Sequence, residues 1–111
     1  MFVLVSPDSG HPDGKARAEV TDVQNLNQLH VEFHAVGDSP AAGALAAAGL
    51  GTVEDGYAWL DISALRAAGE DAGGEDAGAW NDRFEAMLRY AQRNDWVDAG
   101  GTRVRAHIVR T

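Results

Sequence analysis

Strict alternation of apolar and titratable side chains marks one stretch of this chain, Leu29-His30-Val31-Glu32-Phe33-His34-Ala35. In a β-strand, successive side chains point to opposite faces of the sheet. The apolar members would then line one face, and the opposite face would carry His30, Glu32 and His34. Two imidazoles that flank a carboxylate are groups that can bind a metal or move protons. This row is therefore the first candidate site.

Similar patterns predict the neighbouring strands. Short β-type runs occur at residues 2–5 and 15–21, and the polar patch at 22–27 is expected to connect the latter by a hairpin to a strand at 28–36. Residues 53–60 form a further hairpin in this reading, because Asp55-Gly56 is a favoured type I′ turn pair.

The last segment predicts a hairpin that turns at residues 98–101. Trp96 and Val97 precede this turn, and a strand over 102–110 follows it. In that strand three apolar side chains face inward, and three polar ones face outward: Arg103, Arg105 and His107.

Three helices are expected. The first begins near Asp38 or Ser39 as the cap, with Pro40 at the first helical position, and ends at Gly49. The second, over 62–68, is capped by Asp61 and closed by Gly69. The third, over 79–94, carries an apolar stripe of Trp80, Phe84, Met87, Leu88 and Ala91, and a surface ion pair is expected between Glu85 and Arg89.

The acidic repeat at residues 69–78, Gly-Glu-Asp-Ala-Gly twice over, is expected to be a mobile surface loop. Its spacing lacks the alternating oxygen ligands of a calcium-binding loop. Four to six short strands and about three helices without a βαβ rhythm predict an α+β fold, a mainly antiparallel sheet with helices on one face. The length of 111 residues indicates a single domain over 1–111.

The composition narrows the function classes. Ala supplies 20 residues of the 45% apolar content, so the core is lean and burial of a face in an oligomer is expected. A net charge of −8 argues against a generic nucleic-acid or anionic-membrane surface. Without Cys there are no disulfides or thiolate metal sites. Apolar runs are too short for a signal peptide or a membrane span, which favours a soluble cytoplasmic protein.

The candidate row cannot easily hold one metal alone. At roughly 3.3 Å per residue the α-carbons of His30 and His34 would lie about 13 Å apart. A real metal site would pair one of them with Glu32 and recruit His107 or His11 from elsewhere. If the strands at 28–36 and 102–110 were antiparallel neighbours, Glu32 would lie beside Arg105, and a cross-strand pair would be favourable.

Two hypotheses of different classes follow. The first is a non-catalytic interaction or accessory domain that associates with itself or with another protein, through a face that includes Glu32, Arg103 and Arg105. The second is a small enzyme or metal-binding protein that uses His30, Glu32, His34 and His107. No nucleotide-binding glycine loop or catalytic serine motif is present, so no cofactor is expected.

Overall fold

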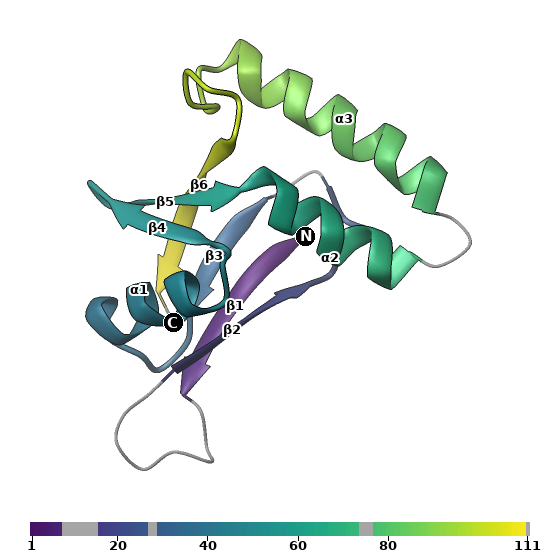
Figure 1. The fold of residues 1–111 in the computed structure, drawn as a ribbon. Helices are drawn as coiled ribbons and strands as arrows, with labels where there is room; N and C mark the ends of the chain where they lie inside the picture. The colour runs from purple at the N-terminus through teal and green to yellow at the C-terminus, as the bar shows by residue number, and fades with distance from the viewer. Residues whose placement is uncertain (8–15, 27–28, 74–76, 111) are drawn as a thin grey trace.

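The computed structural model of the chain describes residues 1–7, 16–26, 29–73 and 77–110. Figure 1 shows their arrangement as an α+β fold. In chain order the elements are β1 (Phe2–Pro7), β2 (Ala16–Thr21), β3 (His30–Phe33), α1 (Asp38–Ala47), β4 (Gly51–Glu54), β5 (Tyr57–Asp61), α2 (Ile62–Gly73), α3 (Ala77–Arg93) and β6 (Arg103–Arg110). The predicted fold class is confirmed. Within the described ranges, no helix is both long enough and apolar enough to cross a membrane.

The strands form one mixed sheet in the order β2-β1-β3-β6-β5-β4. β1 pairs with β3 and β3 pairs with β6 in parallel, whereas β1–β2, β5–β6 and β4–β5 are antiparallel. The sheet is therefore mainly antiparallel, as predicted. The expected hairpin across residues 22–27 is wrong, because β2 pairs with β1 and the chain then crosses over to place β3 on the far side of β1.

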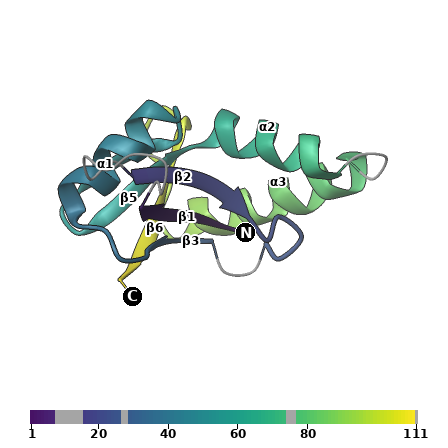
Figure 2. The ribbon, with the colours of Figure 1, turned by 90° about the horizontal axis from the view of Figure 1, so that it is seen from below.

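α1 and α2 cover one face of the sheet, and α3 lies past the ends of the central strands (Figures 1 and 2). The strand residues that point to the covered face are buried, and alternate residues on the same strands are half-buried or exposed. The buried strand residues are Val3, Val5, Val31, Phe33, Ala58, Leu60, Val104, Ala106 and Ile108. This alternation confirms the inward and outward assignments for the centre of β3 and for β6.

Small side chains let α1 lie close to the sheet. Its buried residues are Ala41, Ala44 and Leu45. The helix ends as predicted: Gly49 adopts a φ of +70°, and the Leu50 amide donates to the Leu45 carbonyl at 2.9 Å. The predicted cap is wrong, since Gly37 occupies the cap position without a side-chain hydrogen bond. The Asp38 carboxylate instead accepts two hydrogen bonds from Arg110, each 3.1 Å long.

The β4–β5 hairpin turns at Asp55 and Gly56, whose φ values of +52° and +82° match the predicted type I′ turn. The cap of α2 is also confirmed, because Asp61 Oδ1 accepts the Ala64 amide at 2.9 Å. The predicted end of that helix is wrong. Gly69 lies inside α2, and a Cβ there would overlap the ring of Trp80.

The α2–α3 pair takes up most of the segment that the acidic repeat assigned to a loop. Residues 69–73 belong to α2 and residues 77–78 to α3, while residues 74–76 lie outside the described part of the chain. The reason is tertiary: Gly69 lets α3 approach α2 closely enough for Trp80 and Phe84 to be fully buried with their rings stacked at 4.9 Å.

Polar contacts flank this packing of α3. Glu85 forms an ion pair with Arg66 of α2 instead of the expected Arg89. The Trp80 indole N–H donates to the Val23 carbonyl at 2.7 Å, which ties α3 to the segment after β2.

Candidate functional site

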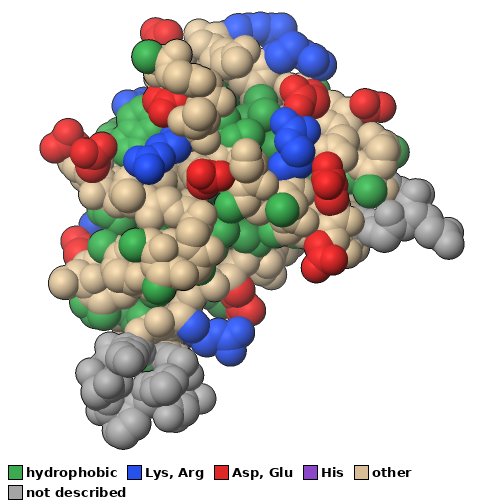
Figure 3. All heavy atoms as spheres, in the orientation of Figure 1, with side chains coloured by type: hydrophobic (Ala, Val, Ile, Leu, Met, Phe, Trp, Pro, Cys, Tyr) green, Lys and Arg blue, Asp and Glu red, His purple; other side chains and the backbone are tan. Residues whose placement is uncertain are grey.

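The face of the sheet opposite α1 and α2 carries the predicted row. Strand register places side chains of four strands next to one another on this face, which we call the open face. β1 contributes Phe2 and Leu4, β3 His30 and Glu32, β6 Arg105, His107 and Val109, and β5 Tyr57 and Trp59. None of the described histidines is visible on the helix-covered side in Figure 3, where acidic and basic side chains are interspersed.

His30 and Glu32 form the closest contact within the predicted row. His30 Nε2 lies 3.1 Å from Glu32 Oε1, and both side chains are less than one third exposed. The His30 ring also stacks on Phe2, with 4.9 Å between the ring centroids. A hydrogen-bonded imidazole and carboxylate held against an aromatic ring can exchange a proton with a bound molecule.

His34 does not continue the row. β3 ends at Phe33, and Ala35 adopts a φ of +56°, which bends the chain out of the sheet. The His34 amide still donates to the Val5 carbonyl at 2.8 Å, but its side chain is exposed beyond the strand. The predicted strand over 28–36 is therefore too long, and Ala35 is exposed instead of lining the apolar face.

The expected contact between Glu32 and Arg105 is not formed. β3 and β6 are neighbours, but they run parallel, so Glu32 lies opposite Val109 and His30 lies opposite His107. Arg105 instead lies over the Tyr57 ring, with its guanidinium carbon 4.4 Å from the ring centroid. Arg103 is exposed and donates to Thr52 Oγ1 at 3.5 Å.

The metal hypothesis gains no geometric support. Among the residues that the structure describes, no group of three or more His, Cys, Asp or Glu side chains is placed to hold one ion. His11, the alternative to His107 as the ligand recruited from elsewhere, lies outside the described residues.

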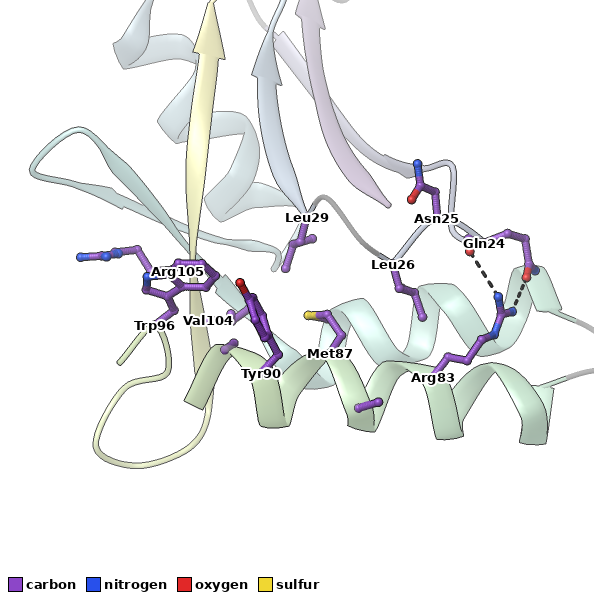
Figure 4. A pocket seen from close by; sticks show the side chains of 12 residues that line it. Gln24, Asn25, Leu26, Leu29, Arg83, Met87, Tyr90, Trp96, Val104 and Arg105 are labelled. Atoms are coloured by element: carbon purple, nitrogen blue, oxygen red, sulfur yellow. Dashed lines mark hydrogen bonds between the residues drawn. The ribbon is translucent and has the colours of Figure 1, made fainter. Parts of the chain in front are cut away.

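A hollow that the sequence did not indicate lies between α3 and the amino ends of β3 and β6 (Figure 4). We call it the α3 groove; its volume is about 740 Å³. Leu26 and Leu29 point into it from the chain segments before β3, and Met87 and Tyr90 point toward them from α3. Trp96 and Val104 line its end at β6.

Local contacts fix the wall of the α3 groove at Trp96. Its amide donates to the Ala91 carbonyl at 2.9 Å, its carbonyl accepts the Arg105 amide at 2.6 Å, and its ring meets Tyr90 edge-on at 5.7 Å. Asp98 stabilises the turn that follows by accepting the amides of Thr102 and Arg103. These two hydrogen bonds hold the pKa of the Asp98 carboxyl below its usual value.

Two cations, Arg83 and Arg105, are among the residues that line the α3 groove, and in Figure 4 the Arg105 side chain extends away from Leu29 and Met87. Arg83 donates to the carbonyl and to the side-chain oxygen of Gln24, at 3.3 and 2.6 Å. A smaller hollow of about 220 Å³ shares Leu29, Trp96 and Arg105 with the groove and adds Tyr57 and His107. The groove therefore leads to the border of the open face.

Sequence reasoning missed the groove because it treated the apolar stripe of α3 as core throughout. Met87 belongs to that stripe but is only half-buried, and neighbouring Tyr90 is 57% exposed. The available signal was that a tyrosine and a methionine three residues apart share one side of a helix. No protein-family model, curated protein or solved structure matches this chain at a significant level.

Proposed function

We propose that this chain is a non-catalytic interaction domain that associates with a second copy of itself through the open face of its sheet. One observation carries the proposal: large apolar side chains on three strands, β1, β6 and β5, remain half-buried or exposed on the face away from α1 and α2. They are Phe2, Leu4, Val109, Tyr57 and Trp59.

The charges of the open face suit a self-complementary contact. Glu32 lies on β3, Glu19 lies on β2 next to its ion-pair partner Arg17, and Arg103 and Arg105 lie on β6. In a two-fold contact the same patch meets itself, so acids of one copy can meet bases of the other only if the patch carries both signs. This face does, whereas the chain as a whole has a net charge of −8.

The size of the open face sets the expected affinity of the dimer. Five inter-strand spacings of about 4.8 Å and strands near 20 Å long give a footprint on the order of 500 Å² per copy. Stable interfaces bury roughly 800 Å² per partner, and smaller ones are weak or transient. We therefore expect a dimer with a micromolar dissociation constant.

A small enzyme that uses the same face is the second candidate, and the His30–Glu32 hydrogen bond is the observation that favours it. Such an enzyme would need its substrate to lie against these two side chains. Dimerisation through the open face would cover them. The interaction domain therefore requires this surface to be buried, whereas the enzyme requires it to be accessible to substrate.

Sedimentation equilibrium across the micromolar range tests the proposal. Leu4→Glu places a charge on β1, between Glu19 and Glu32 on the open face, and should shift the protein to monomer. Ala47→Glu adds the same charge to the exposed side of α1 and should leave the dimer intact. Circular dichroism checks that both variants fold. A wild-type protein that stays monomeric, or equal dissociation by both variants, would contradict the proposal.

A further inference from the structure

We infer that the α3 groove and the adjoining smaller hollow bind a small amphipathic carboxylate, with its apolar tail between α3 and the side chains of Leu26 and Leu29 and its carboxylate at Arg105. This site goes beyond the proposed function, because its apolar part lies past the strand ends and it needs no second copy, although it shares Arg105 with the open face. Four observations carry it: the volume, the apolar lining, the distribution of charge and the fixed position of the aromatic wall.

The volume and lining suit an apolar tail. Small-molecule sites commonly measure about 300–1,000 Å³ and are mostly apolar with a few placed polar groups. The α3 groove measures about 740 Å³. Leu26, Leu29, Met87 and Tyr90 converge on it in Figure 4, and the exposed Tyr90 ring leaves apolar area for a tail to cover.

The charge around the groove selects an anion. The chain contains 17 Asp and Glu residues, yet none of those in the described part of the chain lines the groove or the adjoining smaller hollow. The charged residues in the linings are Arg83 and Arg105, and His107 adds a titratable group. A cationic head group would meet only like charge or neutral surface here, whereas a carboxylate gains attraction from either arginine.

Arg105 is the better anchor of the two arginines. Arg83 already donates two hydrogen bonds to Gln24, which closes its end of the groove (Figure 4). Arg105 makes no ion pair within the described residues, and its guanidinium lies over Tyr57, which lines the smaller hollow. Its planar fork can therefore bind a carboxylate through two parallel hydrogen bonds.

Contacts within the protein already hold the Trp96 wall of the groove in place. Trp96 is fixed on both sides by backbone hydrogen bonds to Ala91 and Arg105, and by the edge of the Tyr90 ring. A wall that is already ordered reduces the entropy cost of binding.

The test uses three probes with the same alkyl tail and different head groups: dodecanoate, dodecanol and dodecylamine. Each probe is titrated into the whole chain, and binding is measured by calorimetry. We expect saturable one-to-one binding of dodecanoate and at least about tenfold weaker binding of dodecylamine, because a charged hydrogen bond contributes more than 1.4 kcal/mol. Arg105→Gln should weaken dodecanoate about tenfold and leave dodecanol unchanged. Arg89→Gln, on the exposed side of α3 and outside the linings of both hollows, is the matched control and should change neither.

A variant at the part of the groove that would hold the apolar tail tests the tail site separately from Arg105. Met87→Glu on α3 should abolish dodecanoate binding without removing Arg105. Leu4→Glu should retain full binding, so failure of dimerisation and failure of this site remain distinguishable. Absence of saturable dodecanoate binding, equal affinity for the acid and the amine, or equal losses in the two arginine variants would overturn the inference. A dimer that dissociates on Met87→Glu, with no ligand bound, would assign the groove to a second copy and also overturn it.

Discussion

The two faces of the sheet are made by the same strands and differ in the size and polarity of the side chains they carry. In β5 the covered face receives Ala58 and Leu60, and the open face receives Tyr57 and Trp59. In β1 the covered face has valines, and the open face has Phe2 and Leu4. Small side chains on the covered face let the helices approach the sheet. Several of the large apolar side chains lie on the open face instead. The comparison indicates that the covered face carries stability and that the open face is available for association.

The sharpest way to break this comparison is to remove one phenylalanine from each face. Phe33 is 1% exposed on the covered face, so Phe33→Ala should lower the free energy of unfolding by about 3–5 kcal/mol. Phe2 is only half-buried on the neighbouring strand, and Phe2→Ala should cost about 1 kcal/mol while weakening the dimer. Urea denaturation measures both changes. Equal losses would mean that the open face is as much a core as the covered one.

Two helical glycines test how closely the covered side is packed. Gly69→Ala places a methyl group against the Trp80 ring and should destabilise the protein by about 1–3 kcal/mol. Gly43→Ala, on the exposed side of α1 with nothing within 4 Å of the new Cβ, should stabilise it by about 0.5–1 kcal/mol. Thermal unfolding compares the two variants. The two changes in stability must have opposite signs. If Gly69→Ala is tolerated, α2 and α3 are further apart than the structure places them.

Two aspartates at helix starts sharpen the comparison on a smaller scale. Asp61 accepts the Ala64 amide, so Asp61→Ala should cost about 1 kcal/mol. Asp38 pairs with Arg110 on the surface and caps no amide, so Asp38→Ala should change stability less than Asp61→Ala does. Chemical denaturation of both variants checks this order, and a larger loss at Asp38 would contradict it.

The smallest effect concerns pH at the turn before β6. Backbone hydrogen bonds from Arg103 and Thr102 lower the pKa of Asp98 below its value in the unfolded chain. The stabilisation is therefore full above the unfolded pKa of about 3.9 and is lost as pH falls through the lower folded pKa. Between about pH 5 and pH 3, the free energy of unfolding of the Asp98→Asn variant should depend less on pH than that of the wild type. Parallel curves for the two proteins would show that Asp98 contributes nothing.

Features set by neighbouring residues were predictable from the sequence. The turn at Asp55-Gly56, the helix end at Gly49 and the cap at Asp61 each depend on backbone conformations that few residue types favour. The alternation in β6 depended only on the period of a strand, and it was also correct.

Features set by distant partners were not predictable. Gly69 resembles a helix end in the sequence, and only Trp80 of the next helix shows why glycine occurs inside α2. Likewise, alternation indicates which residues of β3 and β6 face outward but not whether the strands run parallel, so Glu32 was paired with Arg105 instead of lying opposite Val109. To predict the α3 groove, one would need to know where α3 lies relative to the sheet, and the periodicity of α3 does not give its position.

The place of β6 in the sheet has a consequence for how the molecule assembles. This strand is the latest of the described strands in the sequence, yet it lies between β3 and β5 and joins the three-stranded half of the sheet to the β4–β5 hairpin. Until residues 103–110 are in place, the two halves share no strand pairing among the described residues. Because such long-range pairing is slow to form, the exposed edges of β3 and β5 would be the sites at which an incomplete chain aggregates.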